Sequence, residues 1–397
     1  MESEEGKVKV SFLLNMLMET AVKNSGKKNH GQRYEEDVKL FAAYLFIVGG
    51  RSLYEMLLAN LPNSLPSLTE VGRILNKNSN PVFEGVFRFE ELKEFLIAHN
   101  LPMKVCVSED GTRIQEKFLF DPASNQIVGP VLPLSDNGVP ISRSFPATSA
   151  ASHLKNGEAA STAYAIMAQP LQKGAPSFCL ALFGTNNCFT AEHCFRRWNF
   201  ISSELAKIGI EVISFSSDGD PKLLAAMHSQ MFSPNGDCLL EDWKDWHCAS
   251  AGQNFTVIQD AIHTANKFRK RLSPSTLTPI GNFTASQTHL RQLIKTQPKE
   301  EHGLTEYDLD KEDKMNFNAS LKISTEKVTN LMKATVPGSE ATVAYLTIMR
   351  YMIEACLDEN LSPSERLYKI WNCVLFLRYW KLWLLNHPSY TMDNFVT

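Results

Sequence analysis

Two aspartates stand where an apolar segment gives way to a helical one. The stretch "EVISFSSDGDPKLLAAM", residues 211–227, reads as a buried strand, a turn and a helix, with Asp218 and Asp220 in the turn. A second apolar segment, "MKVCVSED", ends in Glu109 and Asp110. Hard cations such as Mg²⁺ prefer oxygen ligands of this type, and two such ions can support phosphodiester cleavage. If the two strands are neighbours, Asp110 and Asp218 meet at one edge of a sheet and hold metal there.

The same acids also suit a purely structural role. Asp220 is well placed to be the N-cap of the following helix, because Pro221 takes the first helical position. Asp218 is then a solvated turn residue. A phosphate-accepting aspartate after a strand is a third interpretation, and no further motif supports it. Spacing alone leaves these alternatives open.

A basic run lies on the helix that follows the strand "FTVIQ". It can contact a DNA backbone, or it can be an ordinary solvated helix face. The run comes shortly after Asp260 and His263. Its members are Lys267, Arg269, Lys270 and Arg271.

Cysteine and histidine occur together in two loose groups. Neither group has the paired short spacing of a structural zinc site, so we expect free thiols and no zinc. The chain also lacks a glycine–lysine phosphate loop, a G-x-G-x-x-G motif and a nucleophile elbow. The two groups are Cys188, His193 and Cys194 in "CFTAEHC", and Cys238, His247 and Cys248.

The overall composition indicates the class of protein that carries these residues. The chain has 397 residues with 44% hydrophobic and 21% charged side chains, which is typical of a globular protein of two or three structural units. Its net charge of −3 means that any nucleic-acid contact must come from local basic patches. Eight cysteines without a signal peptide indicate reduced thiols in the cytosol or nucleus.

The first hundred residues predict helices. A polar tail follows a weakly amphipathic start in residues 1–30, and the next helical pattern stops at Gly49-Gly50. Two capping boxes follow, Ser52 with Glu55 and Ser67 with Glu70. With the turn "LPNSLP" this arrangement fits a helix-turn-helix, and it fits a plain helical hairpin equally well.

From residue 101 the hydrophobic period changes to that of strands. An antiparallel meander, a helix over 190–208 and the two acid-ended strands predict a mixed α/β (α+β) sheet, and residues 285–386 are helical. The aromatic segment 367–385 is long enough to suggest a membrane span. It carries Lys369, Arg378 and Lys381, so we interpret it as a buried helix and expect no membrane.

Several stretches, taken in order along residues 35–397, match one known family. They resemble P-element-type, THAP-associated transposases and the host proteins derived from them. The stretches are "DVKLFAAYLFIVGGRSLYEML" with "LPNSLPSLTEV", "VSEDGTRI" with "FLFDPASNQIVGPVLPL", "FSSDGDPKLLAAM", "VIQDAIHTANKFRKRL", "EDKMNFNASLKISTEKVTNLM" and "LSPSERLYKIWNCVLFLRYWKLW".

The resemblance implies an RNase H-like catalytic domain that is entered from a helix-turn-helix region and carries a helical insertion. The family binds two Mg²⁺ (or Mn²⁺) ions with an Asp, Asp and Glu triad, for DNA strand cleavage and joining. By motif, Asp110 matches the first acid, with Glu109 as the adjacent alternative. Asp218 matches the second, with Asp220 as the alternative. In the family's insect element the insertion binds GTP, and nothing in this sequence by itself indicates a nucleotide.

The chain departs from the family pattern at both ends. The third acid, a glutamate, is expected after the insertion, and residues 387–397 contain none. The family's zinc-binding THAP domain is also missing, since the first cysteine is Cys106. We therefore expect a truncated protein that is inactive by itself.

These observations predict a transposase-derived, RNase H-like protein whose enzymatic status is open. The alternative is a domesticated, non-enzymatic DNA- or protein-binding protein. We expect DNA as a partner, a homo-oligomer as an option, and a nuclear location with the cytoplasm as the alternative. The predicted regions are a polar tail (1–30), a helix-turn-helix-like region (31–100), an incomplete RNase H-like core (101–284), a helical insertion (285–386) and a truncated return to the core (387–397).

Overall fold

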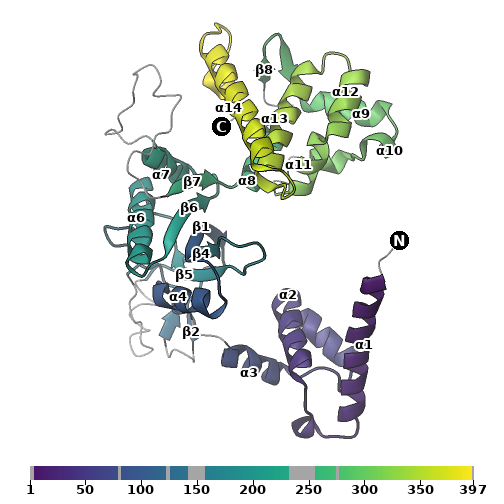
Figure 1. Cartoon of the computed structure of the whole chain (residues 1–397), viewed down its shortest axis with the longest axis vertical. Coiled ribbons are helices and arrows are strands. Elements are labelled where there is room, and N and C mark those ends of the chain that lie inside the picture. Colours follow the sequence, from purple (N-terminus) through teal and green to yellow (C-terminus); the bar gives the residue numbers. More distant parts are fainter. Residues whose placement is uncertain are drawn as a thin grey trace. The chain divides into compact units, whose positions relative to one another are not determined.

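The computed structural model divides the chain into two compact units, Met1–Val82 and Phe83–Thr397 (Figure 1). The structure describes residues 4–78, 82–121, 126–141, 157–231, 255–273, 277–310, 312–313 and 315–395. The candidate ligands Cys238, His247 and Cys248 lie outside the described residues.

Helices build the N-terminal unit around a small apolar core. The core contains Leu17, Ala42, Tyr54, Leu65 and Val71. Residues 1–30, which we expected to be a polar tail, therefore contain a packed helix. The elements are α1 (Glu4–Asn24), η1 (Asn29–Gly31), α2 (Glu36–Asn60) and α3 (Leu68–Asn78).

The helix stop predicted at Gly49-Gly50 coincides with a break in α2. Gly50 has φ 70° and ψ 177°, and α2 resumes beyond it in a new direction. Glycine adopts positive φ at no steric cost, so the helix geometry breaks at this residue. The capping residue predicted for the next helix is confirmed, because the Ser67 hydroxyl accepts the backbone N–H of Glu70 at 3.4 Å.

Among the described residues, α2 is the one helix that is long and apolar enough to cross a membrane by length and composition. Only 17% of its most apolar window is buried. Val38 and Tyr54 pack inside the unit, whereas Leu40, Ile47 and Val48 are exposed.

The second unit contains a five-stranded mixed sheet in the order β5-β4-β1-β6-β7. β1, β4 and β5 form an antiparallel meander, and β6 and β7 run parallel to β1. This confirms the predicted mixed sheet. The apolar segments after β1 do not join this meander and form a separate hairpin of β2 and β3. The strands are β1 (Lys104–Arg113), β2 (Leu119–Asp121), β3 (Gln126–Val128), β4 (Thr162–Pro170), β5 (Phe178–Thr185), β6 (Glu211–Ser217) and β7 (Thr256–Gln259).

Helices cover one face of this sheet. Trp198, Ile201 and Leu205 of α6 are fully buried in one apolar cluster with Val105 and Val107 of β1. Burying such side chains contributes roughly 1.5–3 kcal/mol each, so this face is the main core of the sheet. The covering helices are α4 (Phe89–Ala98), α6 (Ala191–Lys207) and α7 (Pro221–Met231).

Neighbouring residues of β1 point to opposite faces, because side chains alternate along a strand. Glu109 shares a row with Ile166 of β4 and Ser217 of β6, and all three are buried on the covered face. Asp110 is exposed and takes the other face, in the row that leads to Leu182 of β5. Leu182 is 39% exposed. We call this second face the open face.

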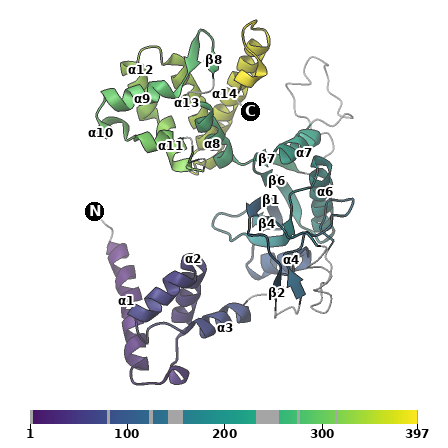
Figure 2. The same cartoon turned by 180° about the vertical axis from the view of Figure 1, so that it is seen from behind.

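The remaining residues form a largely helical region with its own apolar core, drawn in green and yellow in Figures 1 and 2. The predicted helical character of residues 285–386 is confirmed. The elements are α8 (Ala261–Arg271), β8 (Thr278–Ile280), β9 (Phe283–Ala285), α9 (Gln287–Thr296), α10 (Lys299–His302), η4 (Glu306–Leu309), α11 (Phe317–Ser324), α12 (Glu326–Thr335), α13 (Glu340–Leu357), α14 (Pro363–Leu385) and η5 (Met392–Asn394).

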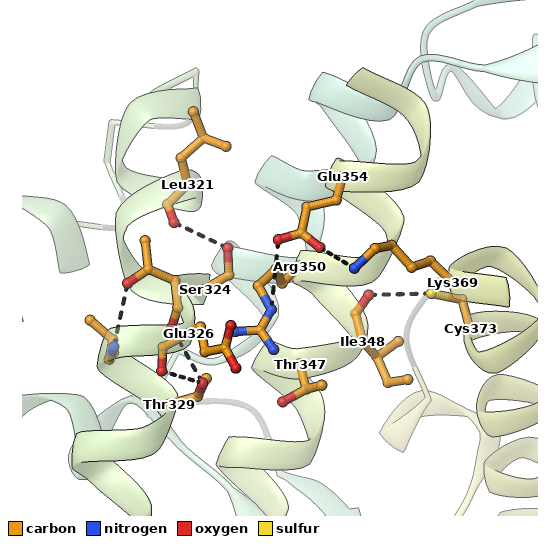
Figure 3. A network of polar contacts seen from close by, with 12 residues as sticks. Leu321, Ser324, Glu326, Thr329, Thr347, Ile348, Arg350, Glu354, Lys369 and Cys373 are labelled. Carbon is orange, nitrogen blue, oxygen red and sulfur yellow. Dashed lines mark hydrogen bonds and ion pairs between the residues drawn. The ribbon is translucent and has the colours of Figure 1, made fainter. Parts of the chain in front are cut away.

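Polar contacts fasten α14 to α13 (Figure 3). The Lys369 ammonium lies 2.6 Å from a carboxylate oxygen of Glu354, and the Cys373 thiol donates to the carbonyl oxygen of Ile348 at 3.4 Å. The prediction that α14 is a buried helix is only partly correct. Trp380 is buried, but Trp371 is 51% exposed, because the helix is apolar on both sides and packs on one.

Candidate functional site at the acid-bearing sheet edge

The strands β1, β6 and β7 bring three aspartates into line. In the parallel ladder, Glu109 pairs with Ser217, and Ser217 pairs with Gln259. The residue that follows each of these three is an aspartate: Asp110 within β1, Asp218 just beyond β6 and Asp260 just beyond β7. Adjacent strands lie about 4.8 Å apart, so carboxylates in neighbouring strands can share one ligand. The condition on which the pairing of Asp110 with Asp218 depended is therefore met, since β1 and β6 are neighbours.

Each predicted acid also orders its own backbone. Asp218 Oδ1 accepts the N–H of Asp220 at 3.0 Å, and Asp220 Oδ1 accepts the N–H of Lys222 at 2.8 Å. Asp110 Oδ1 accepts the N–H of Gly111 at 2.7 Å. The capping role foreseen for Asp220 is therefore real, and Asp218 holds the turn that starts α7. These bonds fix where the carboxylates lie without burying them.

Glu109 occupies a different environment from its neighbour. One of its carboxylate oxygens accepts from Arg197 Nε at 3.0 Å and Nη2 at 2.9 Å. The other accepts from Trp198 Nε1 at 2.9 Å. The Glu109 and Arg197 side chains are only 2% and 1% exposed. Both carboxylate oxygens of Glu109 therefore accept hydrogen bonds from side chains of α6, on the covered face of the sheet.

Arg197 links Glu109 to the surrounding chain. Its Nη1 donates to the carbonyl oxygen of Gly138 at 3.0 Å, and its guanidinium lies 5.3 Å from the ring centre of Tyr164. Burial opposes the charge of Arg197, yet with the Glu109 carboxylate beside it the pKa of Arg197 is raised. Burial, and then the charge of Glu109, raise the pKa of Tyr164 well above its ordinary value. Arg197 therefore stays charged and Tyr164 stays neutral.

Sequence reasoning did not propose Asp260 and His263 as site residues. Asp260 caps α8 by accepting the N–H of Ile262 at 2.7 Å, and its second oxygen lies 2.7 Å from His263 Nδ1. The signal was present, because Asp260 directly follows the apolar stretch "FTVIQ" just as Asp218 follows "EVISFSS". Only the strand order shows that the two stretches are neighbours.

The basic run on α8 divides into different environments. Lys267 Nζ donates to the carbonyl oxygen of Gly219 at 3.0 Å, which places the ammonium at the turn between Asp218 and Asp220. Arg269 is buried, and its guanidinium donates to backbone carbonyls, including that of Asp310 at 2.9 Å. Lys270 is exposed, and Arg271 donates to the carbonyl oxygen of Asp393. Lys267 and Lys270 therefore remain the better candidates for DNA contact.

The cysteines and histidine of "CFTAEHC" each have a separate local role. His193 Nδ1 accepts the N–H of Thr190 at 3.3 Å and completes the cap of α6. Cys194 is buried, and burial raises the pKa of its thiol to about 12. The Cys194 thiol therefore stays protonated at neutral pH. Cys188 and Cys194 form no disulfide within the described residues, as expected.

No protein-family model and no curated protein matches the sequence. Among solved structures, the chain is similar to the Drosophila P element transposase strand transfer complex. The TM-score is 0.57 with 14% sequence identity, over 98% of this chain and 83% of that chain. The fold is transposase-like. At this identity the likeness establishes the fold and nothing finer, and it agrees with the RNase H-like arrangement of the mixed sheet.

The carboxylates on β1 and just beyond β6 can be compared with the ligands that a metal ion needs. In the ranges that the structure describes, no group of three or more His, Cys, Asp or Glu side chains converges. Mg²⁺ usually binds through one or two carboxylates and completes its shell with water and substrate phosphates. Asp110 and Asp218, on neighbouring strands and with oxygen donors only, fit this mode. The buried carboxylate of Glu109 does not.

Proposed function

We propose that this chain is a transposase-derived DNA-processing protein in which Asp110 and Asp218 bind a divalent cation, Mg²⁺ or Mn²⁺. The observation that carries the proposal is the register of β1 and β6, which pairs Glu109 with Ser217 and so aligns the next residues. The similar solved structure is a strand transfer complex, which supports DNA as the substrate. A nuclear location follows from that substrate and stays a prediction.

A divalent cation bound at this edge would activate a water and stabilise the leaving oxygen of a phosphodiester. Other residues of the chain position the two carboxylates for such an ion. Asp110 stays solvent-exposed because Glu109 takes the covered face, and Asp218 is held by its bond to the N–H of Asp220. Lys267 brings a positive charge to the same turn, where it can contact a DNA phosphate.

Strand transfer in this family uses a third carboxylate. Two carboxylates suffice to hold one ion weakly, whereas the two-ion reaction needs a further acid. We infer that metal binding and DNA binding are properties of the chain as described. We further infer that strand transfer depends on a glutamate supplied in addition to Asp110 and Asp218.

Calorimetric titration with Mn²⁺ tests the proposal. We expect binding by the unaltered chain and loss of binding in Asp110→Asn, Asp218→Asn protein. Glu211→Gln is the matched control, since Glu211 is an exposed carboxylate at the other end of β6, paired with Lys104. Binding that persists in the double variant, or that is lost equally in the control, would show that the metal site is wrong.

A second candidate function is non-enzymatic DNA binding. The position of Lys267 favours it, because an ammonium beside the acid turn offsets negative charge without any metal. An assay for cleavage of plasmid DNA in Mn²⁺, run beside a DNA-binding assay, separates the two. Binding without cleavage, equal in wild-type and Asp218→Asn protein, would favour the non-enzymatic function.

A further inference from the structure

A histidine paired with an aspartate lies beside the acid-bearing sheet edge. Asp260 is the single residue between β7, which ends at Gln259, and α8, which begins at Ala261. Its backbone N–H donates to the carbonyl oxygen of Ser217 at 2.9 Å, so Asp260 is tied to the residue that precedes Asp218. The first turn of α8 therefore begins directly beside the turn that carries Asp218.

The carboxylate of Asp260 orients the imidazole of His263. Oδ1 accepts the N–H of Ile262 at 2.7 Å, and Oδ2 lies 2.7 Å from His263 Nδ1. An ionised carboxylate only accepts hydrogen bonds, so the proton of a neutral imidazole lies on Nδ1. Nε2 of His263 is then the basic atom, and among the described residues no group forms a hydrogen bond with it. Because both of its oxygens have partners, Asp260 serves the histidine rather than a cation.

His263 faces the same turn as Lys267. The two residues are four apart on α8, so their side chains leave the same face of the helix. Lys267 Nζ donates to the carbonyl oxygen of Gly219 at 3.0 Å, which fixes this face toward the turn that follows β6. The His263 side chain is 27% exposed, so water reaches the imidazole.

The arrangement of Asp260 and His263 suits one chemical task. When water attacks a phosphodiester, an O–P bond forms, the P–O bond to the leaving oxygen breaks, and the attacking water loses a proton. Imidazole is the side chain that most often accepts such a proton in enzymes. A carboxylate at the opposite ring nitrogen holds the imidazole in the correct tautomer and stabilises the imidazolium that forms.

We propose that His263 accepts the proton of the attacking water through Nε2, with Asp260 as its positioning residue. The leaving oxygen takes a proton from solvent, and the imidazolium then releases its proton to solvent, so the pair is restored after each turnover. The inference rests on the proposed function and extends it from cation binding to phosphodiester hydrolysis. Hydrolysis by this pair needs one cation only, so it does not require the third carboxylate of strand transfer.

The first test is nitrogen NMR of the histidine side chains in the metal-free chain. His193 is the matched reference, because it is also the third residue of its helix and also uses Nδ1 for a hydrogen bond. There, however, Nδ1 accepts the N–H of Thr190 at 3.3 Å. We expect the proton on Nδ1 in His263 and on Nε2 in His193. A proton on Nε2 of His263 would overturn the proposal, because the basic nitrogen would then face Asp260.

The second test is hydrolysis of bis(nitrophenyl) phosphate by the full chain with Mn²⁺. Nitrophenolate leaves without a proton, so the rate reports removal of the proton from water. We expect His263→Gln to lower kcat by about 100-fold or more with little change in KM. Asp260→Asn should also lower kcat, and asparagine caps a helix as well as aspartate does, so this loss does not come from the cap.

The controls distinguish proton transfer from a structural role. His193→Gln should retain the wild-type rate, because Nδ1 of His193 accepts a backbone N–H and leaves no basic nitrogen. Free imidazole should restore hydrolysis to His263→Ala protein and not to Asp218→Asn protein. Circular dichroism melts identify any variant whose loss comes from unfolding, and the tautomer of the unaltered chain is independent of all variants.

The outcomes separate this inference from the proposed function. Full activity in His263→Gln, or a wild-type chain that binds Mn²⁺ through Asp110 and Asp218 but leaves the diester intact, would overturn the proton-transfer pair alone. Weaker Mn²⁺ binding in His263→Gln would also overturn it, because the histidine would then be a cation ligand. Mn²⁺ binding that does not depend on Asp110 and Asp218 would overturn the proposed function itself.

Discussion

Glu109 and Asp110 are consecutive acids on one strand, and the two faces of the sheet give them opposite roles. On the covered face, Glu109 is 2% exposed and both of its oxygens are bound by α6. On the open face, Asp110 is exposed and bonds only to the adjacent N–H among the contacts of the described chain. The comparison shows that burial and pairing, rather than residue type, decide which carboxylate is available to a ligand.

The energetics of the two faces should differ accordingly. A buried charge that loses its partner costs several kcal/mol, whereas an exposed carboxylate is already solvated and contributes little to stability. The pair of Glu109 and Arg197 fixes α6 to β1, and Asp110 directly follows Glu109. The covered face therefore supplies the rigidity that the open face needs to present its acids.

The largest expected effect is in the variant Arg197→Met. We predict a loss of about 3–5 kcal/mol in the free energy of unfolding, because Glu109 is left buried without a counter-charge. Urea denaturation measures it. Asp110→Asn, on the other face, should change the same quantity by less than about 1 kcal/mol.

A double variant sharpens this comparison. Glu109→Gln combined with Arg197→Met removes both charges, so we expect part of the lost stability to return. Equal costs for Arg197→Met and Asp110→Asn would contradict the distinction between the faces.

The next effect concerns the backbone that Arg197 contacts. Gly138 has φ +66°, and a Cβ added there would lie 2.1 Å from the carbonyl oxygen of His193. We predict that Gly138→Ala costs at least about 2 kcal/mol in unfolding free energy, from conformational strain together with the clash. Gly174 has φ +75° with nothing within 4 Å of an added Cβ, so Gly174→Ala isolates the conformational part. Similar costs at both glycines would argue against a packed wall behind Arg197.

Metal addition probes the open face. At a Mn²⁺ concentration ten times the dissociation constant, we predict that the wild-type chain gains about 1.4 kcal/mol in unfolding free energy. The gain should disappear in Asp218→Asn and persist in Glu109→Gln, since Glu109 points to α6. If Glu109→Gln does not fold, Glu211→Gln serves the same purpose. A gain that depends on Glu109 but not on Asp218 would reverse the assignment of the faces.

How much of this could be predicted from the sequence depends on whether a feature is local. The strand, acid and helix around Asp218 are contiguous, so their pattern predicts both the turn and the cap at Asp220. The choice between Glu109 and Asp110 needed the register, because a shift of one residue exchanges the two faces. Asp260 was missed for the same reason, because neither its own segment nor that of Asp218 indicates by itself which strands are neighbours.

Features assembled from distant segments were beyond prediction. In the N-terminal unit the side chain of Asn24 joins Arg33 to Asn63, and no single stretch contains that pattern. Arg269 was predicted to be at a surface because it lies in a basic run, yet α8 turns it inward toward carbonyl groups. Charge along a sequence does not reveal which side of a helix will be covered.

The smallest predicted effect concerns the positive charge of Lys267 beside the two aspartates that follow β6. Lys267 donates to the carbonyl oxygen of Gly219, between Asp218 and Asp220. Its ammonium repels a bound divalent cation, so we predict that Lys267→Gln binds Mn²⁺ about threefold more tightly, a gain of roughly 0.7 kcal/mol for exposed charges. Lys270→Gln, an exposed lysine of the same helix, should leave the affinity unchanged. Weaker Mn²⁺ binding in Lys267→Gln would instead mean that Lys267 orders the turn between Asp218 and Asp220. The carboxylates of the open face would then depend on Lys267 for their position.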